Sequence, residues 1–368
     1  MKMDTRSTLI TRMAVGVALS VASLAAAAQD TTYTLFIAEG TAPANNPTFS
    51  PADDVNNVGE VVGTNFTWVP PGEPTLVEPP IDRFGAILPI NAINDLGVGT
   101  GGAAFPDGRF SLFTLENGVT TNLGTGGNQL ALGNDINNLG EIVGNVRPRN
   151  TRFNRRAFIF RDGEFTDLGS LNRRTDDPAT DFASALAVNN NSEVVGEAAN
   201  RRGLRRAFRW SNGRMINLGS LGRGGRSVAN GINDQGVIVG RSDVNRRGLV
   251  QRAFVWRNRA TGMQDLGALD GTASAANDIN NAGVIVGSFR STVRVGFEST
   301  ENHAAVWIDG EGTDLNAPGV VTNLPDDITL EVANAVNDDG VIVGITCSRQ
   351  CAPGKSRFGR PFALIPNN

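Results

Sequence analysis

The chain has 368 residues and a formal net charge of −4, with 33 Lys and Arg against 37 Asp and Glu. Apolar residues make up 40% of it, which is too apolar for a disordered chain, and its 44 glycines lack the three-residue period of collagen. One His and two Cys exclude zinc fingers and any mechanism that needs two histidines. The acidic balance gives no support for general binding of polyanions.

Residues 1–28 have the features of a secretory signal peptide. Three basic residues precede a short apolar run at 13–24, and alanines at 26–28 supply the small side chains of a cleavage site. The run is shorter than the roughly 20 residues that span a bilayer, which favours cleavage over a retained anchor. We therefore predict an exported protein, periplasmic or extracellular, in which residues 29–368 form one domain without a membrane span.

Export places the two cysteines in an oxidising compartment, where disulfides persist. Cys347 and Cys351 lie four residues apart in a stretch that contains Gly and Pro. We expect them to form a short-loop disulfide, and free thiols are the alternative. Two cysteines at this spacing without a nearby His do not make a metal site, so we expect neither a metal nor a cofactor.

One short phrase recurs along the chain, which calls for a repeat fold. It consists of an apolar residue, Asn, two variable residues, Gly, an apolar run and a second Gly, at intervals of 38 to 57 residues. The fourth copy has Ser192 in place of the first Gly. Asn, Asp and Gly favour a tight turn and the following Val and Ile favour a strand, so each copy predicts a hairpin. The copies are VNNVGEVVG (55–63), INDLGVGTG (93–101), INNLGEIVG (136–144), VNNNSEVVG (188–196), INDQGVIVG (232–240), INNAGVIVG (279–287) and VNDDGVIVG (336–344).

A second predicted hairpin follows most copies. Its first strand is RAFIF (156–160), RAFRW (206–210), RAFVW (252–256) or HAAVW (303–307), and its second strand ends in DLG or NLG. All four tryptophans, at positions 68, 210, 256 and 307, fall at this third-strand position of their units, which points to packing between units. Each unit is therefore a four-stranded meander of about 50 residues, the size of a propeller blade.

The two ends of the chain complement each other. The last copy lacks a fourth strand, while YTLFIAEG (33–40) is a surplus strand before the first copy. Pairing it with RPFALIP (360–366) removes an exposed edge, and an open solenoid would leave the surplus unexplained. We predict an all-β fold: a seven-bladed β-propeller of four-stranded antiparallel blades, with the last blade closed by the N-terminal strand.

The three linked segments, the Asn-Gly phrase, [H/R]AF-x-W and DLGSL, resemble the bacterial extracellular HAF-repeat family over nearly all of residues 33–366. The resemblance implies an exported, propeller-like repeat protein. Arg156, Arg206 and Arg252 stand where the family has its defining His, and His303 retains it. The resemblance implies no activity and no functional residue.

The connections between strands two and three, and between blades, are long and rich in arginine, and loops on a rigid scaffold commonly carry binding sites. Arginine grips carboxylates and phosphates in pairs, so we hypothesise that this face binds an anionic polymer or surface glycan. Solvated surface charge is the alternative. The candidate ligand-binding residues are Arg155, Arg156, Arg201, Arg202, Arg205, Arg206, Arg246, Arg247 and Arg252.

Two other functions stay open at the level of sequence: a propeller enzyme that acts on an extracellular glycan through a carboxylate pair, and a structural surface protein without a discrete ligand. No catalytic residue is identified. His303 has no partners for a catalytic triad, and we interpret it as a packing residue at a strand start. Only Phe153 lies among the arginines, which argues against stacking on nucleic acid. The pattern determines neither the ligand nor the oligomeric state.

Overall fold

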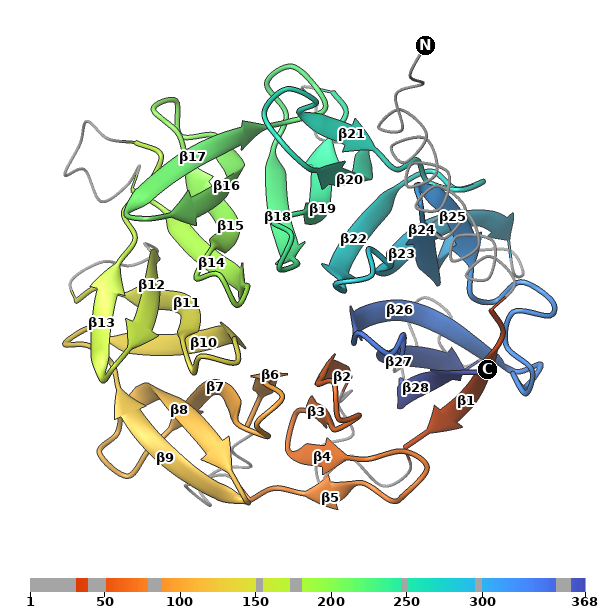
Figure 1. Ribbon diagram of the computed structural model, residues 1–368, viewed down its shortest axis with the longest axis horizontal. Coiled ribbons are helices and arrows are strands. Elements are labelled where there is room, and N and C mark those ends of the chain that lie inside the picture. Colours follow the sequence, from red (N-terminus) through yellow and green to blue (C-terminus); the bar gives the residue numbers. More distant parts are fainter. Residues whose placement is uncertain are drawn as a thin grey trace, which may run out of the picture.

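The chain forms an all-β propeller, as predicted. The structure, a computed structural model, describes residues 31–38, 51–78, 88–149, 155–172, 181–245, 250–294, 300–348 and 359–367. These residues form 28 strands and no helix. The described strands group into seven four-stranded antiparallel units around a central axis (Figure 1), two of which are joined by a single bridge pair, Leu130↔Phe110.

Each unit contributes one strand to each of four layers, from the axis outward. The innermost strands are β2 (Ala52–Val55), β6 (Ile90–Ile93), β10 (Leu130–Ile136), β14 (Ala183–Val188), β18 (Ser227–Ile232), β22 (Ser274–Ile279) and β26 (Ile328–Val336). The second strands are β3 (Val61–Gly63), β7 (Gly99–Ala104), β11 (Ile142–Arg147), β15 (Val194–Ala199), β19 (Ile238–Asp243), β23 (Ile285–Arg294) and β27 (Ile342–Ser348). Blades one to seven are numbered in this order.

The two outer layers complete the blades. The third strands are β4 (Phe66–Trp68), β8 (Phe110–Glu116), β12 (Arg156–Arg161), β16 (Arg205–Ser211), β20 (Gln251–Trp256), β24 (Thr300–Ile308) and β28 (Pro361–Pro366). The fourth strands are β5 (Thr75–Leu76), β9 (Val119–Gly124), β13 (Glu164–Asp167), β17 (Arg214–Gly219), β21 (Met263–Asp265), β25 (Glu311–Asp314) and, for blade seven, β1 (Tyr33–Ile37). All four tryptophans lie on third strands, as predicted.

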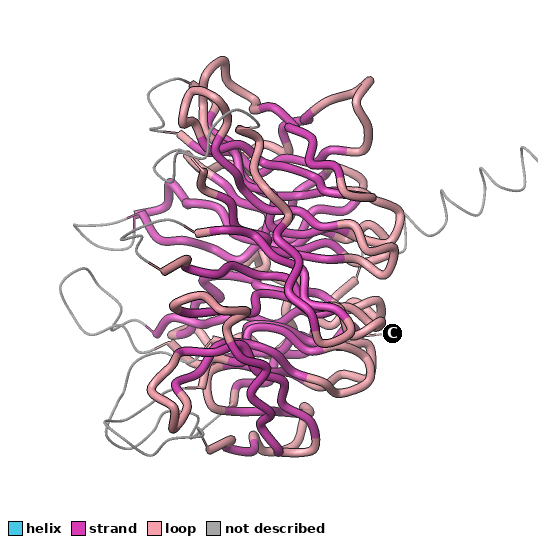
Figure 2. Tube along the Cα trace, turned by 90° about the vertical axis from the view of Figure 1, so that its left-hand side faces the viewer, coloured by secondary structure: helices cyan, strands magenta, loops and turns pink. Residues whose placement is uncertain are grey.

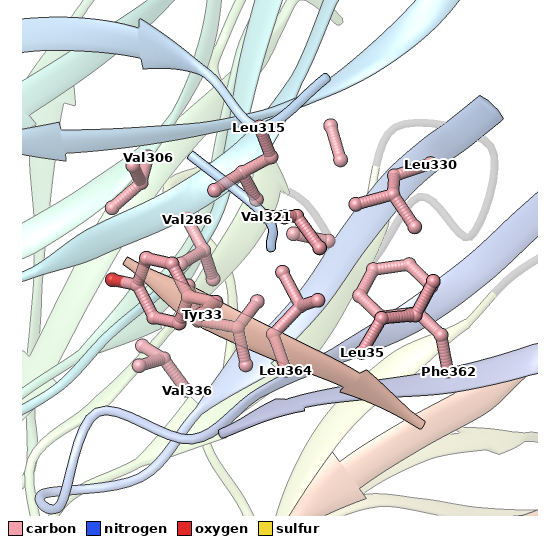
Figure 3. Close-up of a cluster of buried hydrophobic side chains, with 13 residues drawn as sticks. Tyr33, Leu35, Val286, Val306, Leu315, Val321, Leu330, Val336, Phe362 and Leu364 are labelled. Carbon is pink, nitrogen blue, oxygen red and sulfur yellow. The ribbon is translucent and has the colours of Figure 1, made fainter. Parts of the chain in front are cut away.

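The predicted closure of the ring by the two ends of the chain is confirmed. Strand β1 pairs antiparallel with β28, in a register that runs from Tyr33↔Pro366 to Ile37↔Phe362. Tyr33 and Leu35 are buried among side chains of β26, β28 and blade six, including Val286 (Figure 3). The N-terminal strand therefore completes blade seven and also seals its interface with blade six.

Apolar side chains between neighbouring blades form the core. In the described residues there are seven clusters of buried hydrophobic residues, and each combines two adjacent blades. Trp210 of blade four packs with Val143 and Ile159 of blade three, and Trp256 of blade five packs with Val195 of blade four. A single four-stranded sheet cannot bury both of its faces, so the blades depend on each other.

The two glycines of the repeated phrase serve different needs. The first adopts positive φ in the turn, as at Gly236 (φ 73), and Ser192 adopts the same conformation without being Gly (φ 57). The second lies opposite a β-bulge in the innermost strand: a Cβ on Gly240 would lie 2.0 Å from the carbonyl oxygen of Val228. All seven innermost strands carry this bulge, so only Gly fits at the second position.

The strand connections lie on two opposite faces of the ring (Figure 2). Because each blade is an antiparallel meander, the turns between strands one and two and between strands three and four share one face, here called the hairpin-turn face. The connections between strands two and three and between blades share the other, the long-connection face. In the part of the chain described, no helix is long and apolar enough to cross a membrane.

Candidate functional site

The first Asn of each phrase links its own turn to the next blade. In blade five, Oδ1 of Asn233 accepts the backbone N–H of Val237 at 3.0 Å, and Nδ2 donates to the carbonyl of Asn280 in blade six at 3.1 Å. Equivalent inter-blade bonds of 2.9–3.1 Å occur in every blade, and Asn337 closes the circle on the carbonyl of Asn56. These buried residues, the inner ring, are Asn56, Asn94, Asn137, Asn189, Asn233, Asn280 and Asn337.

The residue after each inner-ring Asn forms a second closed circle. Each backbone N–H of this outer ring donates to Oδ1 of the equivalent residue in the next blade at 2.8–2.9 Å. Three members of the outer ring are Asp, and no two of them are neighbours. Three is the largest number of Asp residues that a circle of seven can hold without placing two carboxylates side by side, where they would repel each other. Asn side chains separate them, as where Nδ2 of Asn138 donates to Asp95 at 2.6 Å. The outer ring is Asn57, Asp95, Asn138, Asn190, Asp234, Asn281 and Asp338.

Three buried carboxylates join blades just below these rings. Asp54, Asp135 and Asp278 lie on the innermost strands of blades one, three and six, and each accepts a backbone N–H of the following blade at 2.7–2.9 Å. Burial raises the pKa of Asp135 to about 6. Burial, followed by the charge of Asp135, raises the pKa of Asp54 well above its usual range. These acids are therefore built into contacts between blades.

The bulge residues of the innermost strands add a further set of inter-blade bonds. Where the bulge residue is Asn, its Nδ2 group donates to a carbonyl of the next blade at 2.6–2.9 Å. Blades one and four depart from this pattern, with Asp53 and Leu186. Burial raises the pKa of Asp53 to about 7. The residues that make the bond are Asn91, Asn134, Asn230, Asn277 and Asn334.

The rings surround a cavity of about 160 Å³ on the axis at the hairpin-turn face. All seven blades contribute to its lining, whose described residues include Asp and Asn but no Lys or Arg. The electrostatic character of this mouth therefore disfavours an anionic ligand. In the described residues no group of three or more His, Cys, Asp or Glu is placed to hold a metal ion.

Three arginines occupy the first position of the [H/R]AF-x-W segment. They hold the ends of the blades together on the long-connection face. Arg156 forms ion pairs with Asp167 at 2.9 Å and with Asp181 at 2.5 Å. Arg206, which is 7% exposed, donates to the carbonyl of Gly225. Arg252 donates to the carbonyl of Thr272 at 2.5 Å in the same way. These guanidinium groups already have protein partners, a use that the sequence hypothesis did not foresee.

His303 occupies the equivalent position in blade six. Its Nδ1 atom lies 2.8 Å from Oδ2 of Asp314 on β25, which corresponds to the pairing of Arg156 with Asp167 on β13. Its ring also contacts Phe289 edge-on, with ring centroids 5.5 Å apart. His303 thus packs against Phe289 from within β24, and its polar partner Asp314 is a contact that the sequence interpretation did not include.

The remaining candidate arginines divide into three groups. Arg205 contacts the ring of Phe182, 3.8 Å from its centroid, and pairs with Glu197 at 3.2 Å. Three are exposed on the long-connection face, and two lie outside the described residues. The exposed residues are Arg155, Arg201 and Arg202. The residues outside the described part are Arg246 and Arg247.

Two other predictions also fall outside the described residues. The proposed signal peptide, residues 1–28, precedes the first described residue. Cys347 lies on β27, but its expected partner Cys351 is outside the described part, so the disulfide stays a prediction.

Comparison with known proteins supports the fold. No protein-family model matches the chain, and no curated protein matches it. It is similar to the β-propeller domain of the trilobed protease from Pyrococcus furiosus, with 12% identity and a TM-score of 0.52 over 86% of this chain and 95% of that one. That propeller has an open velcro topology, whereas here β1 pairs with β28.

Two further similarities are weaker. TolB from Acinetobacter baumannii shares 14% identity, with a TM-score of 0.43 over 77% of this chain. This chain spans 62% of the length of that TolB chain. A protein of unknown function from Dyadobacter fermentans shares 11% identity, with a TM-score of 0.42 over 92% of this chain and all (100%) of that one. The similarity to the trilobed-protease propeller supports the propeller fold alone, and membership of the HAF-repeat family stays a prediction.

Proposed function

We propose that the chain is an exported β-propeller interaction module that binds an anionic ligand, such as an acidic glycan or another anionic polymer, on the long-connection face of blades three to five. The observation that carries this proposal is a group of exposed arginines without a carboxylate partner in the described residues. They are Arg155, Arg201, Arg202, Arg223 and Arg226.

Among the described residues of blades three to five, three acids of this face already have other partners. Asp181 is engaged by Arg156 and Glu197 by Arg205. Asp243 is 4% exposed and accepts the backbone N–H of Arg226 at 2.8 Å. A local excess of guanidinium groups therefore exists on a chain whose net charge is −4. Planar guanidinium groups suit bidentate contacts with carboxylate, sulfate or phosphate oxygens.

Export of the module rests on the sequence of residues 1–28. N-terminal sequencing of the protein recovered from its native host should find Gln29 as the first residue. A mature chain that begins at Met1 would contradict this part of the proposal without touching the ligand proposal.

A charge-removal experiment tests the ligand proposal. We expect wild-type protein to be retained on a heparin column at pH 7, and the triple variant Arg155→Ser, Arg201→Ser, Arg202→Ser to elute at a clearly lower salt concentration. Each of these side chains is exposed, so both proteins should have the same thermal midpoint.

A second triple variant controls for overall charge. Arg214→Ser, Arg257→Ser and Arg259→Ser remove three exposed arginines from the hairpin-turn face of blades four and five. This variant should elute like the wild type, because its substitutions leave the long-connection face unchanged. Equal losses in both triple variants would mean that only net charge matters, and no retention of the wild type would overturn the proposal.

A further inference from the structure

A groove of about 740 Å³ opens on the hairpin-turn face between blades one and two, away from the arginines discussed above. Its lining includes Val58, Leu76 and Leu96, which are 69%, 58% and 71% exposed. Val58 and Leu96 occupy the tips of the first turns of their blades, where blades four, five and seven have polar residues; blade three has Leu139, 64% exposed, at this position, but it does not line the groove. Exposed branched side chains around a groove are typical of an interaction surface.

Glu60 lies in the wall of this groove, and two other blades show what a glutamate at its position binds. Glu141 of blade three and Glu193 of blade four follow their inner-ring Asn by four residues, as Glu60 does. Glu141 pairs with Arg161 at 3.2 Å, and Glu193 pairs with Arg209. In both blades the inner-ring amide also donates to the carboxylate.

Blade one lacks both of these arginines. In the strand register, Thr67 is equivalent to Arg209, and Val69 is equivalent to Arg161. The carboxylate of Glu60 has no hydrogen bond or ion pair with any other described residue, and Thr67 faces the same groove. Burial raises the pKa of Glu60, as expected for a carboxylate that has lost water without gaining a partner.

The groove is acidic, and its charge limits the kinds of ligand that can bind in it. Glu78 and Asp95 also line it, and none of the described residues that line it is Lys or Arg. An occupant must therefore combine a cation that replaces the missing guanidinium with apolar groups that cover Val58, Leu76 and Leu96. A polypeptide with an arginine between aliphatic residues provides both on one chain.

We propose that the groove between blades one and two binds a partner polypeptide by placing one of its arginines against Glu60, between aliphatic side chains that cover Val58 and Leu96. Blades three and four close the equivalent positions with their own arginines. Blade one leaves the position open to a partner. This surface is separate from the anion-binding face and does not depend on the function proposed there.

Two labelled peptides test the proposal by fluorescence anisotropy with the full chain. The probe is acetyl-Leu-Ala-Arg-Ala-Leu-amide carrying a C-terminal fluorophore, and its analogue has citrulline, a neutral isostere, in place of arginine. We expect the arginine peptide to bind at least about tenfold more tightly. Glu60→Gln should abolish this preference. The matched control Glu164→Gln, an exposed glutamate in blade three outside the groove, should retain it.

A variant that adds a contact tests whether a loss of peptide binding could be caused by misfolding. Thr67→Arg introduces the arginine of blade four beside Glu60, and it should abolish peptide binding while leaving the thermal midpoint unchanged or higher. Equal binding of both peptides to the wild type, or an unchanged preference in either Glu60→Gln or Thr67→Arg, would overturn the proposal. So would an absence of saturable binding. Wild-type dimerisation in sedimentation that Glu60→Gln abolishes, without peptide binding, would instead identify a second copy as the occupant.

Discussion

The axis and the rim of this propeller follow different rules. At the axis, all seven blades make the same inner-ring bond from Asn to the next blade, at nearly the same length. Farther from the axis, in the region here called the rim, equivalent positions diverge: Glu193 pairs with Arg209 in blade four, while blade one has Thr67 at the position of Arg209. Sequence identity among the repeats is therefore strictest where the blades must close on each other, and differences accumulate where ligands can reach.

Closure explains why the axis permits so little variation. Each inner-ring amide serves its own turn through Oδ1 and the next blade through Nδ2, so one residue links local structure to assembly. Because the circle has no end, a defect in one blade weakens two interfaces. At the rim, a side chain contacts its own blade or one neighbour, and its loss stays local.

The largest expected effect is the loss of one inner-ring amide. Asn280→Ala would leave the N–H of Val284 without its partner and would remove the inter-blade bond to the buried carbonyl of Asn337, which would keep only the N–H of Gly340 from its own turn. We expect the free energy of unfolding to fall by about 3 to 5 kcal/mol, measured by urea denaturation. The rim control is Asn258→Ala, which removes only an exposed turn cap and should cost about 1 kcal/mol. Similar costs for both variants would contradict the distinction between axis and rim.

The sequence was sufficient to predict the architecture, because the patterns that determine the strands and turns are local and recur in each blade. The Asn-Gly turn, the Val- and Ile-rich strand and the aromatic third strand recur in order, and the surplus strand at 33–40 matched the deficit at the C-terminal end. These patterns fix hairpins and strand order without knowledge of neighbouring blades.

The candidate site was less predictable because its contacts join residues of different blades. Turn chemistry alone accounts for Asn280, because Asn favours this type of turn. The local sequence therefore does not predict its second bond, to blade seven. The only sign of that bond is that Asn occurs at this position in all seven copies. Likewise, Arg206 was a candidate ligand-binding residue, but it is buried and donates to the carbonyl of Gly225 in the connection to the next blade. The groove at Glu60 is recognised only when strand register aligns Thr67 with Arg209.

A smaller effect should come from repairing an irregularity of the axis. Asp53 stands where five other blades have a bulge Asn that donates to the next blade, and burial raises its pKa to about 7. Against an unfolded value of about 3.9, this shift contributes stability that is complete below about pH 4 and is lost as the pH rises towards 7. Asp53→Asn should therefore raise the free energy of unfolding by about 1 to 2 kcal/mol at pH 8 and flatten its dependence between pH 4 and 7.

The other irregular blade supplies the matched control. Leu186→Asn restores the bulge amide in blade four without changing a charge, so it should leave the pH dependence of stability as in the wild type. Part of that dependence should also persist in Asp53→Asn, because burial raises the pKa of Asp135 to about 6. A pH profile of urea midpoints that is identical in Asp53→Asn and the wild type would contradict the role of Asp53.

The smallest expected effect concerns the one repeat that breaks the turn pattern. Ser192 adopts φ 57 where the other six copies have Gly, and a residue with a Cβ pays about 1 kcal/mol for this conformation. Ser192→Gly should raise the free energy of unfolding by about that amount. The reverse change, Gly140→Ser in blade three, where φ is 75 and no atom lies within 4 Å of the new Cβ, should lower it equally. Because neither change touches an inter-blade bond, unequal magnitudes would show that the turns are coupled to the closed rings rather than local to each blade.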